Sequence, residues 1–240
     1  MGVESGEWIL RGLKYSDKNC LHSPADLVQK VNEVGFLPLF RNPVPNFSVE
    51  EFTVPSHWWC ENPELDPWEW RKNAASGHEV VYGKFFGRKA GFVSLDWLPH
   101  FANYRRDGYD FDVLWDDAKA SFRMKKIMDL FPDNEQLFSC DIKRRAGFGK
   151  SGEKNFEGTL TDLEMRFYLT MSDFRCRLNK FGIPYGWSIS MYSRPEALWG
   201  YDLVTEKYSI KPSKSFEIIM EHALSLYQDT NEVELFKLLK

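Results

Sequence analysis

Residues 139–154, SCDIKRRAGFGKSGEK, contain more bases than acids and could bind an anion. The acids of this run are Asp141 and Glu153, and its bases are Lys143, Arg144, Arg145, Lys150 and Lys154. Cationic side chains at this spacing can neutralise neighbouring phosphates, and each neutralised phosphate releases counterions from a nucleic acid. The run therefore predicts phosphate binding, and the alternative is a solvated loop without a ligand.

The positive charge is local, because the whole chain of 240 residues has a formal net charge of -4. Residues 139–194 hold ten bases and six acids, which gives a net charge of +4. The flanking segments, 1–138 and 195–240, have net charges of -5 and -3. A basic segment between acidic ones is typical of a nucleic-acid contact.

Metal and cofactor chemistry has little support in the sequence. The four cysteines form no CxxC pair and the five histidines are scattered, so we expect no metal site and no cofactor. The acids of residues 107–117, DGYDFDVLWDD, lack the turn glycine of a calcium loop. They are better explained as the acidic start of a helix, where they favour the helix dipole.

The composition is that of a soluble globular protein, with 43% hydrophobic and 28% charged residues. The 16% of aromatic residues predict a large core, and a stacking surface for bases is the alternative. The first residues, MGVESGEW, lack the order of a secretory signal, and no apolar run approaches the ~20 residues that span a bilayer. We expect a cytoplasmic protein with no membrane partner.

The elements that must position the basic run follow the order of a winged helix. We predict a helix over residues 113–131, a second over residues 139–146, and a third opened by the capping box of Thr161 and Glu164. Strands around residues 167–174 and 187–192 follow as a ribbon. In helix-turn-helix modules the later helix enters the major groove of DNA while neighbouring elements contact the backbone.

The rest of the chain adds further helices and one hairpin. Ser23 and Pro24 predict the start of a helix that Gly35 closes, residues 80–94 read as a hairpin, and amphipathic helices end the chain. The predicted fold class is α+β, mostly helical, with winged-helix units packed as one body. We expect an N-terminal winged-helix-like region over residues 1–112, a winged-helix domain over residues 113–200, and C-terminal helices over residues 201–240.

Nine basic residues of the predicted helices and ribbon would then converge on one face that binds duplex DNA. They are Lys143, Arg144, Arg145, Lys150, Lys154, Arg166, Arg175, Arg177 and Lys180. Contacts with phosphates carry no base code, so the binding would be largely independent of sequence. Glu157, Asp162 and Glu164 lie near the third helix and would oppose it.

Four stretches carry a resemblance to a known family, and the similarity extends over most of residues 24–200. They are LVQKVNEVGFLPLF, KAGFVSLDWLPHF, GTLTDLEM and the ribbon that ends in YSRPEAL. The chain resembles the AlkZ (YcaQ) family of alkylpurine DNA glycosylases, and most of all its AlkZ-related branch of bacterial proteins. The resemblance implies tandem winged-helix units and a role in DNA repair.

The chain departs from that family at the positions of the catalytic motif. Where the family has polar side chains that direct water to the sugar carbon, the resemblance places Pro38 and Phe40, and its His-Glu pair falls on Gly91 and Phe92. None of these four candidate cleft residues can transfer a proton or stabilise a cation. We therefore expect a DNA-binding relative of the glycosylases without catalytic residues, either inactive or altered in its chemistry.

Two alternatives stay open. The first is an active DNA glycosylase whose acid or base has moved to a carboxylate that the sequence places in an exposed loop or helix start: Glu50, Glu51, Glu64, Asp66, Glu69 or Asp96. The second is a protein-interaction or small-ligand module with no role on DNA, which would suit the net negative charge.

Overall fold

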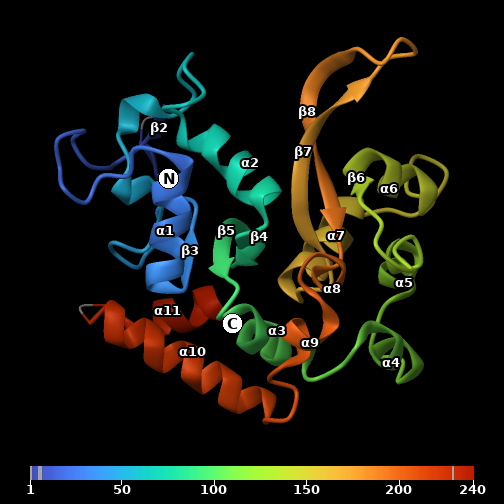
Figure 1. Cartoon of the computed structure of the whole chain (residues 1–240). Coiled ribbons are helices and arrows are strands. Elements are labelled where there is room, and N and C mark those ends of the chain that lie inside the picture. The colour runs from blue at the N-terminus through green and yellow to red at the C-terminus, as the bar shows by residue number, and fades with distance from the viewer. Residues whose placement is uncertain (1, 5–6, 229) are drawn as a thin grey trace. The chain divides into compact units, whose positions relative to one another are not determined.

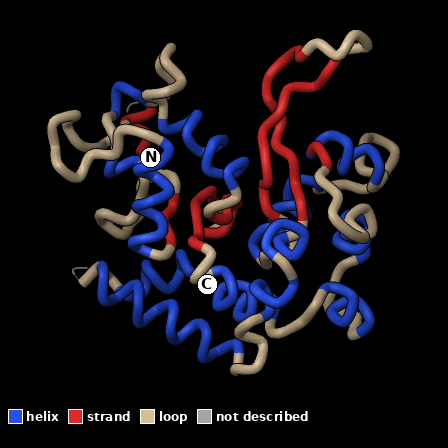
Figure 2. Tube along the Cα trace, viewed as in Figure 1, coloured by secondary structure: helices blue, strands red, loops and turns tan. Residues whose placement is uncertain are grey.

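The computed structural model describes residues 2–4, 7–228 and 230–240, and the chain forms two compact units (Figures 1 and 2). Unit 1 comprises Met1–Leu98 and Phe216–Lys240, and unit 2 comprises Pro99–Ser215. Both units combine helices with antiparallel strands, so the predicted α+β class is confirmed. The division into folding domains 1–112, 113–200 and 201–240 stays a prediction.

Unit 1 packs helices against a group of three antiparallel strands in which β3 and β4 both pair with β5. Its elements are β1 (Gly2–Glu4), β2 (Glu7–Ile9), α1 (Pro24–Val34), β3 (Phe36–Pro38), the 3-10 helices η1 (Glu50–Phe52) and η2 (Pro55–His57), α2 (Pro67–Gly77), β4 (Val80–Phe86), β5 (Lys89–Ser94), most of α10 (Pro212–Leu226), and α11 (Glu232–Leu239). The hairpin predicted over residues 80–94 is confirmed as β4 and β5.

Local signals determine helix α1. The Ser23 side chain accepts a hydrogen bond from the Asp26 backbone N–H at 3.1 Å, and Gly35 ends the helix at a φ of 84°. Leu27 and Val31, four residues apart on one face, are fully buried. The predicted helix is thus confirmed at both ends.

His222 fixes helix α10, most of which belongs to unit 1, to the end of the first helix and to the turn that follows β5. The His222 ring stacks on Trp97 at a centroid distance of 4.2 Å, and its Nε2 lies 3.0 Å from the Val34 carbonyl oxygen. A Cβ on Gly35 would lie 2.6 Å from the Trp97 ring, so this close approach requires glycine.

Unit 2 contains short helices and a long hairpin, β7–β8, with β6 paired to the other side of β8. Its elements are α3 (Leu98–Arg106), α4 (Phe111–Asp116), α5 (Phe122–Met128), β6 (Leu137–Phe138), α6 (Ser139–Arg145), α7 (Phe156–Met165), β7 (Thr170–Leu178), β8 (Pro184–Ser193), α8 (Pro195–Trp199) and α9 (Tyr201–Thr205). In unit 1 β5 lies between β3 and β4, and in unit 2 β8 lies between β7 and β6. The distal half of the β7–β8 hairpin extends past the helices of unit 2 (Figure 1).

Two of the predicted helices have the wrong bounds. Instead of one helix over residues 113–131 there are two, α4 and α5, because Ala118 adopts a left-handed φ of 56° and Ser121 caps a new helix at the Met124 N–H. Likewise Thr161 and Glu164 open no helix, since α7 already begins at Phe156 and buries both side chains. In α7 the packing of buried side chains overrides a short local pattern.

A buried ion pair lies in the core of unit 2. Arg106 is 1% exposed, and its guanidinium donates hydrogen bonds to the Glu196 carboxylate at 2.5 Å, to the Tyr208 hydroxyl at 3.2 Å and to the Phe167 carbonyl oxygen. The Tyr168 ring lies 4.8 Å from the guanidinium carbon. Burial alone would lower the pKa of Arg106, but the Glu196 carboxylate raises it above its ordinary value. The pair joins α3 to α8.

Candidate nucleic-acid interface

Helix α6 exposes three consecutive bases at its C-terminal end. Ile142 is fully buried and fixes the helix, while Lys143, Arg144 and Arg145 point to solvent. Gly147 ends the helix at a φ of 75°. Cations in the last turn interact favourably with the negative end of the helix dipole, so this arrangement is stable without any ligand.

The turn after α6 is closed by Glu153, whose charge is neutralised by helix α5. Its carboxylate accepts hydrogen bonds from Arg123 Nε at 3.1 Å and from Lys126 Nζ at 3.2 Å. These bonds lower the pKa of Glu153. Arg123 and Lys126 are not among the nine bases predicted from the sequence. Arg123 and Lys126 bind the Glu153 carboxylate. Lys150 and Lys154 of the same turn therefore face solvent without an acidic partner among the residues that the structure describes.

Asp141 connects α6 with the hairpin. Its Oδ1 lies 3.0 Å from Arg144 and 3.6 Å from Arg177 of β7, and the Arg177 guanidinium also donates to Cys140 Sγ. One carboxylate therefore brings a base of the helix and a base of the strand together. On the same strand Arg175 is paired with Asp173 at 2.5 Å.

Arg144, Arg175 and Arg177 are thus the members of the predicted nine that are ion-paired with carboxylates. The other six have no carboxylate at ion-pair distance within the described part of the chain: Lys143, Arg145, Lys150, Lys154, Arg166 and Lys180. A phosphate would not have to displace an acidic partner at these six positions, which lowers the cost of binding one.

Helix α7 presents a poor surface to DNA. Six of its ten residues are buried, among them Glu164, which the sequence had placed near the phosphates. Its exposed side carries Glu157 and the half-buried Asp162, and Arg166 follows the helix as its C-cap. Any phosphate contact of this unit is therefore expected from α6, its turn and the hairpin.

The hairpin tip is apolar and exposed. Asn179 organises the turn, because its side-chain oxygen accepts from the backbone N–H groups of Phe181 and Ile183 at 2.8 and 3.1 Å. Trp187 is 93% exposed, and the other exposed apolar side chains of the tip are Leu178, Phe181, Ile183 and Tyr185. We call these five residues the apolar tip; single exposed apolar residues are ordinary, but five within residues 178–187 of one hairpin favour an interaction site.

The prediction that the aromatic residues lie mainly in the core is wrong for those of the apolar tip. The sequence contains a pattern that indicates their exposure: Phe181, Tyr185 and Trp187 lie beside Gly182 and Gly186. Both glycines adopt a positive φ. Turns lie on the surface, so aromatic residues in a glycine-rich turn are expected to be exposed.

Of the four residues expected in a catalytic cleft, Pro38, Gly91 and Phe92 lie in strands β3 and β5 of unit 1, and Phe40 follows β3. Pro38 and Gly91 face each other in register on β3 and β5, and Leu37 faces Phe92. Pro38, Gly91 and Phe92 are buried, and a Cβ on Gly91 would lie 2.5 Å from the Phe86 ring. The half-buried Phe40 packs against Trp58 at 5.1 Å. These contacts give the four residues a packing role.

Two of the carboxylates considered as replacement acids are buried, contrary to expectation. Glu50 accepts from the backbone N–H groups of Arg11 and Arg41 at 3.2 and 3.0 Å. Asp66 caps α2, and its Oδ1 accepts from the N–H groups of Trp59 and Trp68 at 3.0 and 2.8 Å. Both carboxylates therefore hold backbone in place.

Asp66 makes a testable contribution to pH dependence. Burial raises its pKa, so the folded chain holds this proton more tightly than the unfolded chain. The stabilisation that follows is present below the unfolded pKa and is lost as the pH rises through the folded pKa. Asp66→Asn keeps both hydrogen bonds and should remove the decrease in the free energy of unfolding, measured in urea, as the pH rises above the ordinary pKa of an aspartate, about 4. Asp66→Ala should cost about 1–2 kcal/mol at every pH. Equal pH dependence in wild type and Asp66→Asn would contradict this assignment.

Among the described residues there is no group of three or more His, Cys, Asp or Glu side chains that could hold a metal ion. Within the same residues, every helix is too short or too polar to cross a membrane.

Comparison with known proteins gives one match. A family model described as AlkZ related matches residues 21–240. No curated protein matches the chain. No solved structure matches it either.

Proposed function

The chain belongs to the AlkZ-related family, and from this premise we propose that unit 2 binds duplex DNA through its phosphates. The observation that carries the proposal is the set of six exposed or half-exposed bases without carboxylate partners on α6, its turn, the end of α7 and the hairpin tip. The rest of the chain is acidic, so this local surplus of bases favours contact with an anionic partner.

A winged helix over residues 122–193 is the arrangement that we propose for this contact. It is supported by the order α5, β6, α6, α7, β7, β8 and by the pairing of β6 with β8. The hairpin would be the wing. The acidic exposed side of α7 favours backbone contacts by α6 and the wing over base reading by α7, so sequence preference should be weak.

The apolar tip gives the wing a second means of contact. DNA-binding proteins insert apolar side chains between base steps and open the stack there. Lys180 lies in the turn of the hairpin, with its Nζ 4.9 Å from the centre of the Phe181 ring. A cation and an aromatic ring would therefore contact the same stretch of nucleic acid. This combination favours nucleic acid over a purely apolar partner.

We further propose that the protein does not excise bases with the residues that the family uses. The support is that Pro38, Phe40, Gly91 and Phe92 carry no titratable group and serve packing. The test is abasic-site formation on duplexes that contain alkylated purines. No product above the protein-free rate is the expected result, whereas turnover would establish that a relocated acid or base is at work.

Replacing Lys143, Arg145 and Lys150 by Ala should weaken duplex binding by a similar factor for all sequences. Three fewer phosphate contacts should reduce the slope of log K against log salt by about 3. Fluorescence anisotropy over a salt series measures both effects.

The matched control replaces Lys14, Lys18 and Lys237, three exposed bases of unit 1, by Ala. It changes the net charge equally and should leave the slope nearly unchanged. If both triple variants lose the same affinity, only net charge matters and the assigned surface is wrong.

A further inference from the structure

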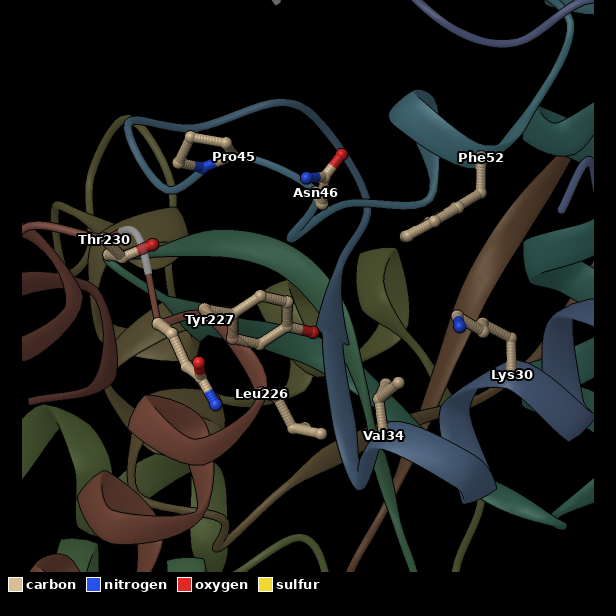
Figure 3. Close-up of a pocket in the computed structure, with 9 residues that line it drawn as sticks. Lys30, Val34, Pro45, Asn46, Phe52, Leu226, Tyr227 and Thr230 are labelled. Atoms are coloured by element: carbon tan, nitrogen blue, oxygen red, sulfur yellow. The ribbon is translucent and has the colours of Figure 1, made fainter.

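A pocket of about 290 Å³ lies in unit 1, apart from the bases discussed above (Figure 3). It is formed by α1, the segment that leads to η1, and the C-terminal end of α10. The residues that matter here are Lys30, Val34, Asn46, Phe52, Leu226 and Tyr227. The volume is at the lower end of small-molecule sites, which suits a ligand with a single ring.

Two hydrogen-bond donors of the pocket lack partners in the described part of the chain. The Lys30 ammonium lies 4.9 Å from the centre of the Phe52 ring, and no described carboxylate is at ion-pair distance from it. The Tyr227 ring packs on Phe47 at 4.5 Å, while its hydroxyl has no hydrogen-bond partner among the described residues. Figure 3 shows both groups directed to the pocket.

The Tyr227 hydroxyl acts as a donor throughout the physiological pH range. Burial, followed by the charge of Glu51, raises the pKa of Tyr227, so the phenol keeps its proton. Glu51 itself is occupied, because its carboxylate accepts from the Asn46 N–H at 2.9 Å and from the Ser48 hydroxyl at 2.6 Å. These two hydrogen bonds stabilise the negative charge of Glu51, so its repulsion of an anion bound at Lys30 is reduced.

The rest of the lining is mixed, because Asn46, Gln228 and Thr230 are polar while one wall is apolar. Val34 from α1, Leu226 from α10 and the face of Phe52 supply a hydrocarbon wall beside the two donors. An ammonium above an aromatic ring keeps its affinity for an anion, because the ring satisfies only one side of the charge.

From this geometry we propose that the pocket binds a small apolar carboxylate, with one ring or a short chain as its body. The carboxylate accepts from Lys30 Nζ and the Tyr227 hydroxyl, and the body packs on Val34, Phe52 and Leu226. This ligand site is independent of the DNA contact proposed for unit 2.

The test compares phenylacetate with the neutral, nearly isosteric phenylacetamide by protein-observed NMR titration of the full chain. Phenylacetate should bind with a Kd of about 1 mM, and the amide about tenfold more weakly. Lys30→Met should weaken phenylacetate about tenfold and leave the amide unchanged. Tyr227→Phe, which keeps the ring packing, should weaken phenylacetate about threefold. Lys14→Met, an exposed control, should bind like wild type.

The proposal is wrong if phenylacetate shows no binding at about 10 mM, or if acid and amide bind wild type equally. It is also wrong if Lys30→Met binds phenylacetate as wild type does. Circular dichroism confirms folding of each variant; should Lys30→Met unfold, Lys30→Gln takes its place, and the acid-to-amide ratio of wild type decides independently.

Discussion

Glu196→Ala is expected to destabilise unit 2 by about 3–5 kcal/mol, because it leaves the Arg106 guanidinium buried without its counter-charge. Arg106 is 1% exposed and lies 2.5 Å from the Glu196 carboxylate, so water cannot replace the lost partner. The Tyr208 hydroxyl and the Phe167 carbonyl oxygen would remain as neutral acceptors only. Urea unfolding followed by tryptophan fluorescence measures the loss.

Two comparisons separate a buried unpaired charge from simple loss of contact. Arg106→Met combined with Glu196→Met removes both charges and should cost less than Glu196→Ala alone. Glu234→Ala breaks the exposed pair with Lys237 on α11 and should cost below about 1 kcal/mol. If Glu196→Ala and Glu234→Ala lose the same free energy of unfolding, the buried pair contributes no more to stability than an exposed pair does.

Trp187→Ser is expected to weaken duplex DNA binding by about 10–100-fold with little change in melting temperature. A base that stacks on an aromatic side chain contributes about 1–3 kcal/mol. Trp187 is 93% exposed, so its removal costs almost no packing within the protein. Phe181→Ser at the same tip should act in the same direction, and anisotropy at constant salt measures both.

The matched control for the apolar tip is Val233→Ser, which removes an exposed apolar side chain from α11 in unit 1. It should leave DNA affinity unchanged. If Trp187→Ser and Phe181→Ser bind DNA like wild type, the apolar tip does not insert between DNA bases. It must then contact a partner of another kind.

Helices with strong signals at both ends could be predicted from the sequence. Ser23 and Gly35 impose capping geometry that few other conformations satisfy, so α1 begins and ends where expected. The break at Ala118 could not be predicted, because alanine favours helix and seldom adopts a left-handed φ, here 56°.

The candidate surface could be predicted in part for a similar reason. Charge counts along the chain identify Lys143 and Arg145, since ionised groups rarely lie buried without partners. Which acids neutralise which bases depends on tertiary contacts, so the capture of Glu153 by Arg123 and Lys126 could not be foreseen. Nor can composition show that Trp187 has no neighbour to cover it, because aromatic residues serve cores and surfaces alike.

Unit 1 is built from both ends of the chain, and this has a consequence for biosynthesis. The first part of unit 1, which ends at Leu98, cannot pack against helices α10 and α11 until the ribosome has added the residues up to Leu239. At about 5–20 residues per second, that delay is roughly 7–30 seconds. For most of this delay Trp97 lacks its His222 partner, and β4 lacks α11 until the delay ends. Unit 2 is complete as soon as Ser215 has been added, before α10 and α11 are finished. The nascent N-terminal half is therefore the part of this protein that most needs a chaperone during translation.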